Sequence, residues 1–264
     1  MSARLEGVNV VVTRPAHQAE ALCQRLEQEG AGLIRFPVLE IAEPRDKKTL
    51  FGIINRLADF DLAIFISPNA VNRAIPMINS RTGFPQHLLV AAVGRGSARA
   101  LEKSGRPADI FPQQSFNSEA LLALPELHAV KGKRIVIFRG EGGRELLADT
   151  LRERGAELAY AECYRRIIPQ IDILPLLKHW QRDDVHIIIV TSNDGLQNLY
   201  DMVGSQGQPY LIKTPMVVIS ERMCALSNKL GFIHTPIVAE SASDEALVNA
   251  VLTWRGDQQT STIL

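Results

Sequence analysis

Small, polar or basic residues follow the predicted strands of this chain at one position after another. The positions that could contact a ligand are Thr13, Arg14, Ser67, Asn69, Ala70, Gly94, Ser97, Arg139, Gly140, Ser192, Asn193 and Ser220. Where a strand leads into a helix, the helix offers unpaired N–H groups and a partial positive charge, and an arginine can grip a carboxylate with two hydrogen bonds. We therefore expect these positions to bind a small molecule that carries several carboxylates or phosphates.

Each of these residues also has a purely structural interpretation. The three serines that precede predicted helices fit helix caps, and the two arginines fit surface ion pairs. The glycines between residues 140 and 143 resemble a phosphate-binding turn, but they match neither the GxGxxG nor the GxxxxGK pattern, which argues against nucleotide binding. No Ser-His-Asp or Cys-His spacing can be read from the chain, so the sequence identifies no nucleophile.

The first half of the chain repeats in the second half, 125 positions later. Residues 10–14 correspond to residues 135–139, and Gly30 corresponds to Gly155. Each of these two glycines follows a leucine-bearing helical stretch, and we expect each to end its helix in the left-handed conformation. A duplicated unit predicts two similar lobes, and the crevice between paired lobes is a common place for a small ligand.

Short runs rich in Val and Ile alternate with amphipathic stretches of helical period, which is typical of an α/β protein with parallel sheets. The predicted strands are Asn9 to Thr13, Gly32 to Phe36, Leu62 to Ile66, Leu89 to Val93, Arg134 to Phe138, Glu157 to Ala161, His186 to Val190 and Met216 to Ile219. We expect two flavodoxin-like, doubly wound lobes. Ligands of such sheets bind outside the carboxyl ends of the strands, where the candidate residues lie.

Two stretches bounded or ended by proline interrupt this alternation, at residues 37–44 and 162–169. They correspond under the 125-residue shift, favour an extended backbone, and are interpreted as two linkers that join the lobes. If the chain crosses at both, one lobe comprises residues 1–37 with 168–264 and the other residues 38–167. Residues 204–209 are predicted to form a surface loop, and residues 255–264 a frayed tail.

The composition is that of an ordinary globular protein. Lys and Arg number 29 against 29 Asp and Glu, which excludes a general attraction to nucleic acid or to acidic membranes. No apolar stretch is long enough to cross a bilayer, and residues 1–15 lack the apolar block of a signal peptide, so we expect a cytoplasmic protein. The three cysteines and six histidines show neither disulfide nor metal-site spacing. We expect a monomer with no metal.

Several short segments share their order and spacing with a known family. They are Thr13-Arg14-Pro15, Phe36-Pro37, Phe65-Ile-Ser67-Pro-Asn-Ala-Val71, Ala92-Val-Gly94-Arg-Gly-Ser97-Ala, Arg139-Gly140 with Gly143-Arg-Glu-Leu146, and Tyr164-Arg. Together the segments resemble uroporphyrinogen-III synthase over nearly the whole chain. The resemblance implies a two-lobed enzyme without cofactor that dehydrates the linear tetrapyrrole hydroxymethylbilane and closes it to uroporphyrinogen III with the last ring inverted. It also implies transient contact with the preceding enzyme of the pathway.

The same resemblance implies roles for individual residues. Tyr164 matches the family tyrosine that is the best candidate for assisting departure of the hydroxyl, and Ser67, Ser97 and Ser192 match the cleft Ser/Thr positions. Two positions depart from the family pattern: Met223 stands where a hydroxyl is common, and Ser97 stands where threonine is usual. Judged by its place in the chain alone, Tyr164 also fits a packed linker aromatic.

The implied substrate carries acetate and propionate groups on every ring, so helix N-termini would supply its anion sites without a strongly basic protein. The enzyme must hold a folded geometry in which the substituted carbon of the last ring is attacked, so positioning should contribute more than any one acid or base. The main alternative is a non-catalytic two-lobed binding protein or sensor for a small polyanion. A third interpretation is a nucleotide-sugar or phosphoribosyl enzyme that uses the turn at residues 140–143.

Overall fold

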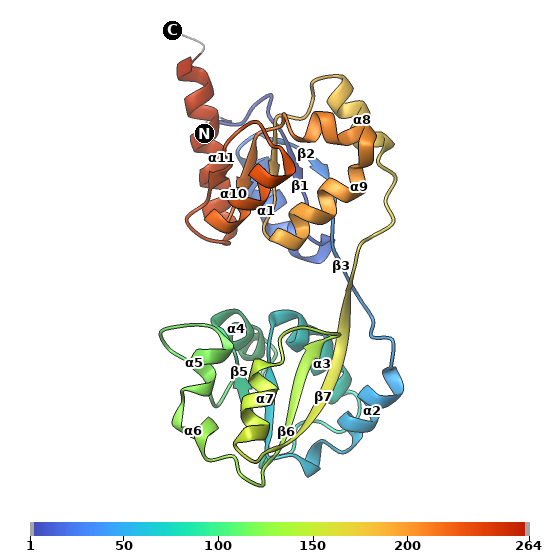
Figure 1. Cartoon of the computed structure of the whole chain (residues 1–264), viewed down its shortest axis with the longest axis vertical. Helices are drawn as coiled ribbons and strands as arrows, with labels where there is room; N and C mark the ends of the chain where they lie inside the picture. Colours follow the sequence, from blue (N-terminus) through green and yellow to red (C-terminus); the bar gives the residue numbers. More distant parts are fainter. Residues whose placement is uncertain (1–2, 262–264) are drawn as a thin grey trace. The chain divides into compact units, whose positions relative to one another are not determined.

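The structure, a computed structural model, describes residues 3–261 and divides into two compact units (Figure 1). Unit 1 contains the residues up to Glu40 and those from Ile167 onward, and unit 2 contains Ile41–Arg166. Within the described residues each unit has its own five-stranded sheet, covered by helices. The predicted fold class, an α/β protein with two lobes built on parallel sheets, is confirmed.

The sheet of unit 1 has the strand order β10-β9-β8-β1-β2, with parallel pairing between neighbours. Its strands are β1 (Asn9–Val12), β2 (Gly32–Arg35), β8 (Ile187–Ile189), β9 (Met216–Val218) and β10 (Ile237–Val238). Its helices are α1 (Ala16–Gln28), α8 (Leu174–Gln181), α9 (Asn193–Leu211), α10 (Glu221–Leu230) and α11 (Asp244–Ser261). A parallel pair needs a crossover connection, which explains why helices separate the strands along the chain.

Alternating side chains of β1 bury both faces of this sheet. Val10 and Val12 pack on one side with residues of α1 and α11, and Val11 packs on the other side with residues of α8, α9 and α10. A strand buried on both faces reads as a continuous apolar run, as residues 10–12 do. The predicted left-handed glycines are confirmed, with φ of 88° at Gly30 and 86° at its repeat partner Gly155.

The sheet of unit 2 has the order β3-β7-β6-β4-β5. Its strands are β3 (Glu40–Ala42), β4 (Leu62–Phe65), β5 (Leu89–Ala92), β6 (Arg134–Gly140) and β7 (Glu157–Ile167). The helical segments are α2 (Lys47–Asn55), the short 3-10 turn η1 (Leu57–Asp59), α3 (Pro68–Asn79), α4 (Arg95–Lys103), α5 (Ser118–Leu122), α6 (Pro125–His128) and α7 (Leu146–Glu153). Phe65 and Phe138 stack with their ring centroids 4.7 Å apart, which joins β4 to β6 through their side chains.

The two stretches interpreted as linkers are extended, but they are also part of the unit 2 sheet. Glu40–Ala42 forms β3, and residues 162–167 continue β7, which lies next to β3 in the strand order. Cys163 and Tyr164 are both buried, and because successive side chains of a strand point to opposite faces, both faces of this part of β7 are covered. The linkers of the prediction are therefore paired strands in part, and the chain passes between units after Glu40 and after Arg166.

The prediction of a surface loop at residues 204–209 is wrong. These residues lie inside α9, which bends at Gly204, where φ is 55° and ψ is −170°. Gly207 is buried, and a side chain there would clash with Val203, because an added Cβ would lie 2.6 Å from the valine Cβ. The glycines, which suggested a loop, instead allow the bend and the close packing. Residues 255–261 of the predicted tail belong to α11, and residues 262–264 lie outside the described part.

Among the helices of residues 3–261, none is long and apolar enough to cross a membrane. The three cysteines are free thiols, with Cys23 and Cys163 buried and Cys224 half-buried. Burial raises the pKa of the Cys163 thiol to about 12, so this thiol is protonated at neutral pH and is a poor nucleophile.

Candidate active site

A pocket of about 280 Å³ lies in unit 2, at the carboxyl ends of its central strands. Its lining residues are Ile66, Val93, Ser118, Ile137, Arg139, Gly140, Glu141, Gly142, Gly143, Arg144, Leu147, Ala148, Tyr160, Tyr164 and Arg166. Apolar side chains form one part of this wall, and the loop between β6 and α7 forms the polar part. The candidates Arg139, Gly140 and Tyr164 are therefore brought together, as the rule for ligand sites in parallel sheets predicts.

Tyr164 lies on β7 and is almost fully buried, with 1% of its surface exposed. Its ring packs against the backbone of Gly140 so closely that a Cβ there would lie 2.6 Å from the ring atom Cε2. Its hydroxyl oxygen is 3.1 Å from Ser67 Oγ, and either oxygen can donate the hydrogen bond. Tyr164 therefore has the packed position expected of a linker aromatic and also lines the pocket.

Ser67 is the N-cap of α3, as one of the two interpretations from the sequence predicted. Its Oγ accepts a hydrogen bond from the backbone N–H of Ala70 at 3.1 Å, and Pro68 follows as the first helical residue. A serine hydroxyl has two acceptor lone pairs and one proton. The cap bond therefore leaves the Ser67 proton available for Tyr164, so capping and contact with the tyrosine do not compete.

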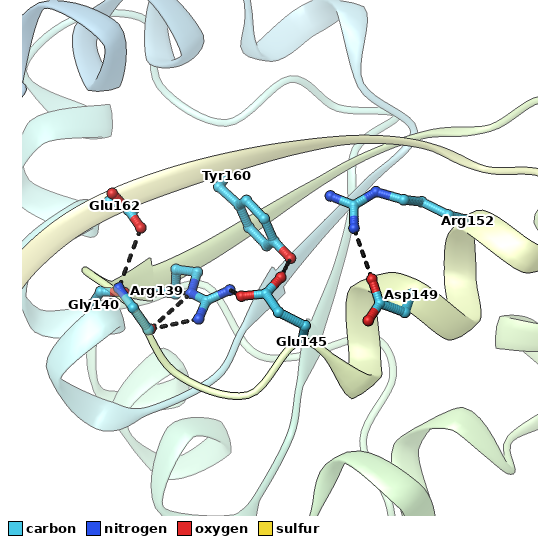
Figure 2. A network of polar contacts seen from close by, with 8 residues as sticks. Arg139, Gly140, Glu145, Asp149, Arg152, Tyr160 and Glu162 are labelled. Carbon is cyan, nitrogen blue, oxygen red and sulfur yellow. Dashed lines mark hydrogen bonds and ion pairs between the residues drawn. The ribbon is translucent and has the colours of Figure 1, made fainter.

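Arg139, at the end of β6, is enclosed by its own loop (Figure 2). Its guanidinium donates from Nη1 to Glu145 Oε1 at 2.9 Å and from Nη2 to the Gly142 carbonyl at 2.5 Å. Nε faces the carbonyls of Gly140 and Gly142 at 3.3 and 3.2 Å. The guanidinium carbon also lies 4.6 Å from the centre of the Tyr160 ring. The expectation that Arg139 is an ion-pair residue is met, although the arginine is buried rather than on the surface.

Glu145 joins Arg139 to Tyr160, because its second carboxylate oxygen accepts a hydrogen bond from the Tyr160 hydroxyl. That hydrogen bond, followed by the one from Arg139, lowers the pKa of Glu145. Burial, followed by the hydrogen bond to Glu145, raises the pKa of Tyr160. At neutral pH a carboxylate, a guanidinium and a neutral phenol therefore lie in contact here, and Glu145 balances the charge of Arg139 within the protein.

The remaining candidates of unit 2 lie near this pocket but do not line it. Ala70 and Ser97 are buried, Asn69 is half-buried in the first turn of α3, and Gly94 caps α4. The turns after β4 and β5 are close together, since a Cβ at Gly96 would lie 3.1 Å from Pro68 Cγ. The sequence reasoning missed Tyr160, Arg144 and Arg166 as lining residues; a signal for Arg144 was its place beside the glycine turn.

In unit 1, three of the strand-end candidates line a second hollow, of about 310 Å³. Its lining residues are Thr191, Ser192, Asn193, Asp194, Ile219, Ser220, Arg222 and Met223. Ser192 caps α9 through the Gly195 N–H at 2.9 Å, whereas Ser220 precedes α10 without a side-chain cap bond. Within the described chain the buried Asn193 Oδ1 has no hydrogen-bond partner. Three of the five candidates in this unit thus share one hollow.

Thr13 and Arg14 are instead held by their own unit. The Thr13 hydroxyl is buried and donates to the Ile189 carbonyl at 2.7 Å. Arg14 donates to Asp244 Oδ1 at 2.5 Å and to the Ala242 carbonyl at 2.6 Å, which ties the end of β1 to the start of α11. Arg14 and Arg139, which correspond in the repeat, are therefore each paired with a carboxylate and a backbone carbonyl.

The family model described as uroporphyrinogen-III synthase HemD matches residues 20–249. The uroporphyrinogen-III synthase of Escherichia coli (strain K12) is 34% identical over 246 residues, which cover 92% of this chain and 100% of that protein. The enzyme of Salmonella typhimurium (strain LT2) is 35% identical over 247 residues, with the same coverage.

Solved structures show the same fold. A mutant uroporphyrinogen III synthase from the extremely thermophilic bacterium Thermus thermophilus superimposes with a TM-score of 0.62 at 18% identity, covering 96% of this chain and 99% of that one. The uroporphyrinogen-III synthetase of Helicobacter pylori 26695 gives a TM-score of 0.58 at 13% identity, covering 94% and 99%. At such identities this likeness supports the fold alone.

Proposed function

The chain belongs to the uroporphyrinogen-III synthase family, and from that premise we propose that the pocket of unit 2 holds the hydroxymethyl end of the substrate. The enzyme converts hydroxymethylbilane to uroporphyrinogen III by loss of water and ring closure, as part of tetrapyrrole biosynthesis. Loss of the hydroxyl leaves a reactive, cation-like azafulvene. A protein acid can speed this loss by protonating the departing hydroxyl, and the protein must hold the substrate so that the substituted carbon of its last ring attacks.

The contact between Tyr164 and Ser67 is the observation that supports this proposal. Ser67 Oγ accepts from the Ala70 N–H, so its own proton can be donated to the Tyr164 oxygen, 3.1 Å away. In that arrangement the Tyr164 proton points to a further acceptor, and we propose that this acceptor is the leaving hydroxyl. Tyr164 is then the catalytic residue, with Ser67 fixing the direction of its proton.

We propose that the arginines that line the pocket and are exposed, Arg144 and Arg166, bind carboxylates of the substrate. Their guanidinium groups can each hold a carboxylate with two parallel hydrogen bonds. The other candidates stay predictions as substrate-binding positions: Thr13, Arg14, Asn69, Ala70, Gly94, Ser97, Ser192, Asn193 and Ser220. A cytoplasmic location, a monomeric state and transient contact with the preceding enzyme also stay predictions.

Product analysis tests the activity directly. The protein is incubated with hydroxymethylbilane as it is generated enzymatically, and the oxidised porphyrins are separated by chromatography. We expect uroporphyrin III in place of the isomer I that forms without enzyme. A product that remains isomer I in the presence of folded protein would contradict the assignment and favour a binding protein.

The Ser67→Ala variant tests the hydrogen bond to Tyr164. We expect it to lose about 1 kcal/mol of stability, because the cap of α3 is removed. We also expect kcat to fall about fivefold, which corresponds to one hydrogen bond of about 1 kcal/mol. Chemical denaturation and steady-state kinetics measure the two effects.

The matched control is Asn117→Ala, which removes the cap of α5 in the same unit, where Asn117 Oδ1 accepts from the Ala120 N–H at 2.8 Å. This control should lose similar stability and keep its rate. Equal losses of rate in both variants would show that Ser67 acts only through the stability of unit 2.

A further inference from the structure

The guanidinium of Arg139 has little room for a ligand. Only 4% of its side chain is exposed, and Nη1, Nη2 and Nε all face oxygen atoms of the same loop. One face of the group is covered by the Tyr160 ring at 4.6 Å. A substrate carboxylate could reach this cation only if a bond already made within the protein were broken.

Glu145 is the outer member of the ion pair. Its side chain is 49% exposed against 4% for Arg139, so the carboxylate is the solvent-facing partner of this ion pair. Its bonds to Arg139 and to the Tyr160 hydroxyl connect the far end of the loop to β6 and to β7 (Figure 2). We call Arg139, Glu145 and Tyr160 the clasp.

The clasp holds the part of the loop that touches Tyr164. Arg139 donates hydrogen bonds to the carbonyls of Gly140 and Gly142. Glu141 lies between these two glycines in the chain, and its N–H donates to the Tyr164 carbonyl at 2.8 Å. Gly140 itself lies against the Tyr164 ring. The position of the Tyr164 side chain therefore depends on the loop that the clasp fixes.

The arginine at the corresponding position of unit 1 is used in the same way. Arg14 donates hydrogen bonds to Asp244 and to the Ala242 carbonyl. Again the arginine side chain is less exposed than that of its acid, at 12% against 28%. The acids do not correspond in the repeat, since one lies six residues after its arginine and the other 230 residues after it. Each half thus neutralises its arginine with an acid at a different place in the repeat.

We propose that Arg139 is a positioning residue, which acts through the loop on Tyr164, and that it is not a ligand of a substrate carboxylate. In contrast, Arg144 of the same loop is exposed and lines the pocket, which suits the carboxylate-binding role proposed for it above. This inference rests on the proposed role of Tyr164. It replaces the expectation from the sequence that Arg139 grips the substrate with two hydrogen bonds.

Kinetics of Arg139→Gln, Glu145→Gln, their double variant and Arg144→Gln test the assignment. We expect kcat to fall on the order of tenfold in Arg139→Gln with KM within about twofold of the wild type, because a small displacement of a catalytic group costs rate more than affinity. Glu145→Gln should show the same fall, and the double variant no larger one, since both remove the same clasp. Arg144→Gln should instead raise KM and weaken its dependence on salt, with little change in kcat.

Glu145→Gln separates the two possible roles of Arg139 by the direction of its effect. If Arg139 were a ligand, removing its competitor would expose the cation and lower KM; that result, or a raised KM at constant kcat in Arg139→Gln, would overturn the proposal. Because Glu145 is half exposed, this variant should fold even if Arg139→Gln does not.

A surface ion pair of unit 1 provides the matched controls. Arg35→Gln and Glu20→Gln make the same changes of charge in a pair at 2.8 Å whose side chains are 45% and 57% exposed, and both should keep wild-type kinetics. Formation of isomer III by the wild type is measured alongside. A failure of that activity would sink the proposed function, whereas a failure of the variant pattern alone would sink only the role of Arg139.

Discussion

Tyr164→Phe should lower kcat about a hundredfold while the product remains mainly uroporphyrinogen III, at the lower end of what a positioned general acid contributes. The substitution removes the hydroxyl that lies 3.1 Å from Ser67 Oγ and keeps the ring that packs against Gly140. Water or the substrate itself can still protonate the leaving hydroxyl, so the reaction becomes slow but is not lost. The rest of the protein still holds the substrate in its bent conformation, so the isomer formed should not change.

Stopped assays with chromatography of the oxidised porphyrins measure the rate and the isomer ratio together. Tyr210→Phe is the control, because Tyr210 is a partly exposed tyrosine of unit 1 that stacks with Trp180. It should leave the rate unchanged. Unaltered turnover in Tyr164→Phe would remove this residue from the chemistry, and a switch to isomer I would mean that its hydroxyl directs the fold of the substrate.

Gly140→Ala should damage both stability and rate. The added Cβ would lie 2.6 Å from Tyr164 Cε2 and 2.7 Å from Cζ, and the ring cannot retreat because it is almost fully buried. Forcing one extra carbon into such a packed place costs about 1–3 kcal/mol. The ring must tilt, so its hydroxyl leaves Ser67, and we expect a loss of kcat as large as that of Tyr164→Phe.

Denaturant unfolding and kcat are measured for Gly140→Ala and for the control Gly52→Ala. Gly52 lies inside α2, where a Cβ would meet nothing within 4 Å, so the control should keep its rate and gain up to about 1 kcal/mol from helix propensity. Wild-type stability and rate in Gly140→Ala would show that the Tyr164 ring has freedom that its packing does not suggest.

The features of the fold that could be predicted are those that depend on residues close together in the sequence. The strands of both sheets follow from apolar runs such as residues 10–12, and the ends of α1 and α7 follow from Gly30 and Gly155. The pairing of β3 with β7 could not be predicted, because it joins residues more than a hundred positions apart across short stretches that also fit an unpaired linker. The bend of α9 was misread because glycine marks loops and close helix packing alike.

The candidate site also contains features that the sequence predicts and features that it does not. That Arg139, Gly140 and Tyr164 belong to one pocket follows from the rule that parallel strands present their carboxyl ends at one edge. The partners of the arginines could not be read from the chain: Asp244 is 230 residues from Arg14, and Glu145 was one of several acids near Arg139. Sequence shows where charges stand along the chain but not which of them neutralise each other.

The two units differ in how their chain is ordered, and this has a consequence for synthesis on the ribosome. Unit 2 is one continuous stretch, whereas β1, an interior strand of the unit 1 sheet, pairs with β8, which begins at Ile187. At about 5–20 residues per second, the amino-terminal segment waits roughly 7 to 30 seconds for that partner strand. The inserted unit can therefore acquire its structure first, while an apolar strand made earlier remains exposed to chaperones.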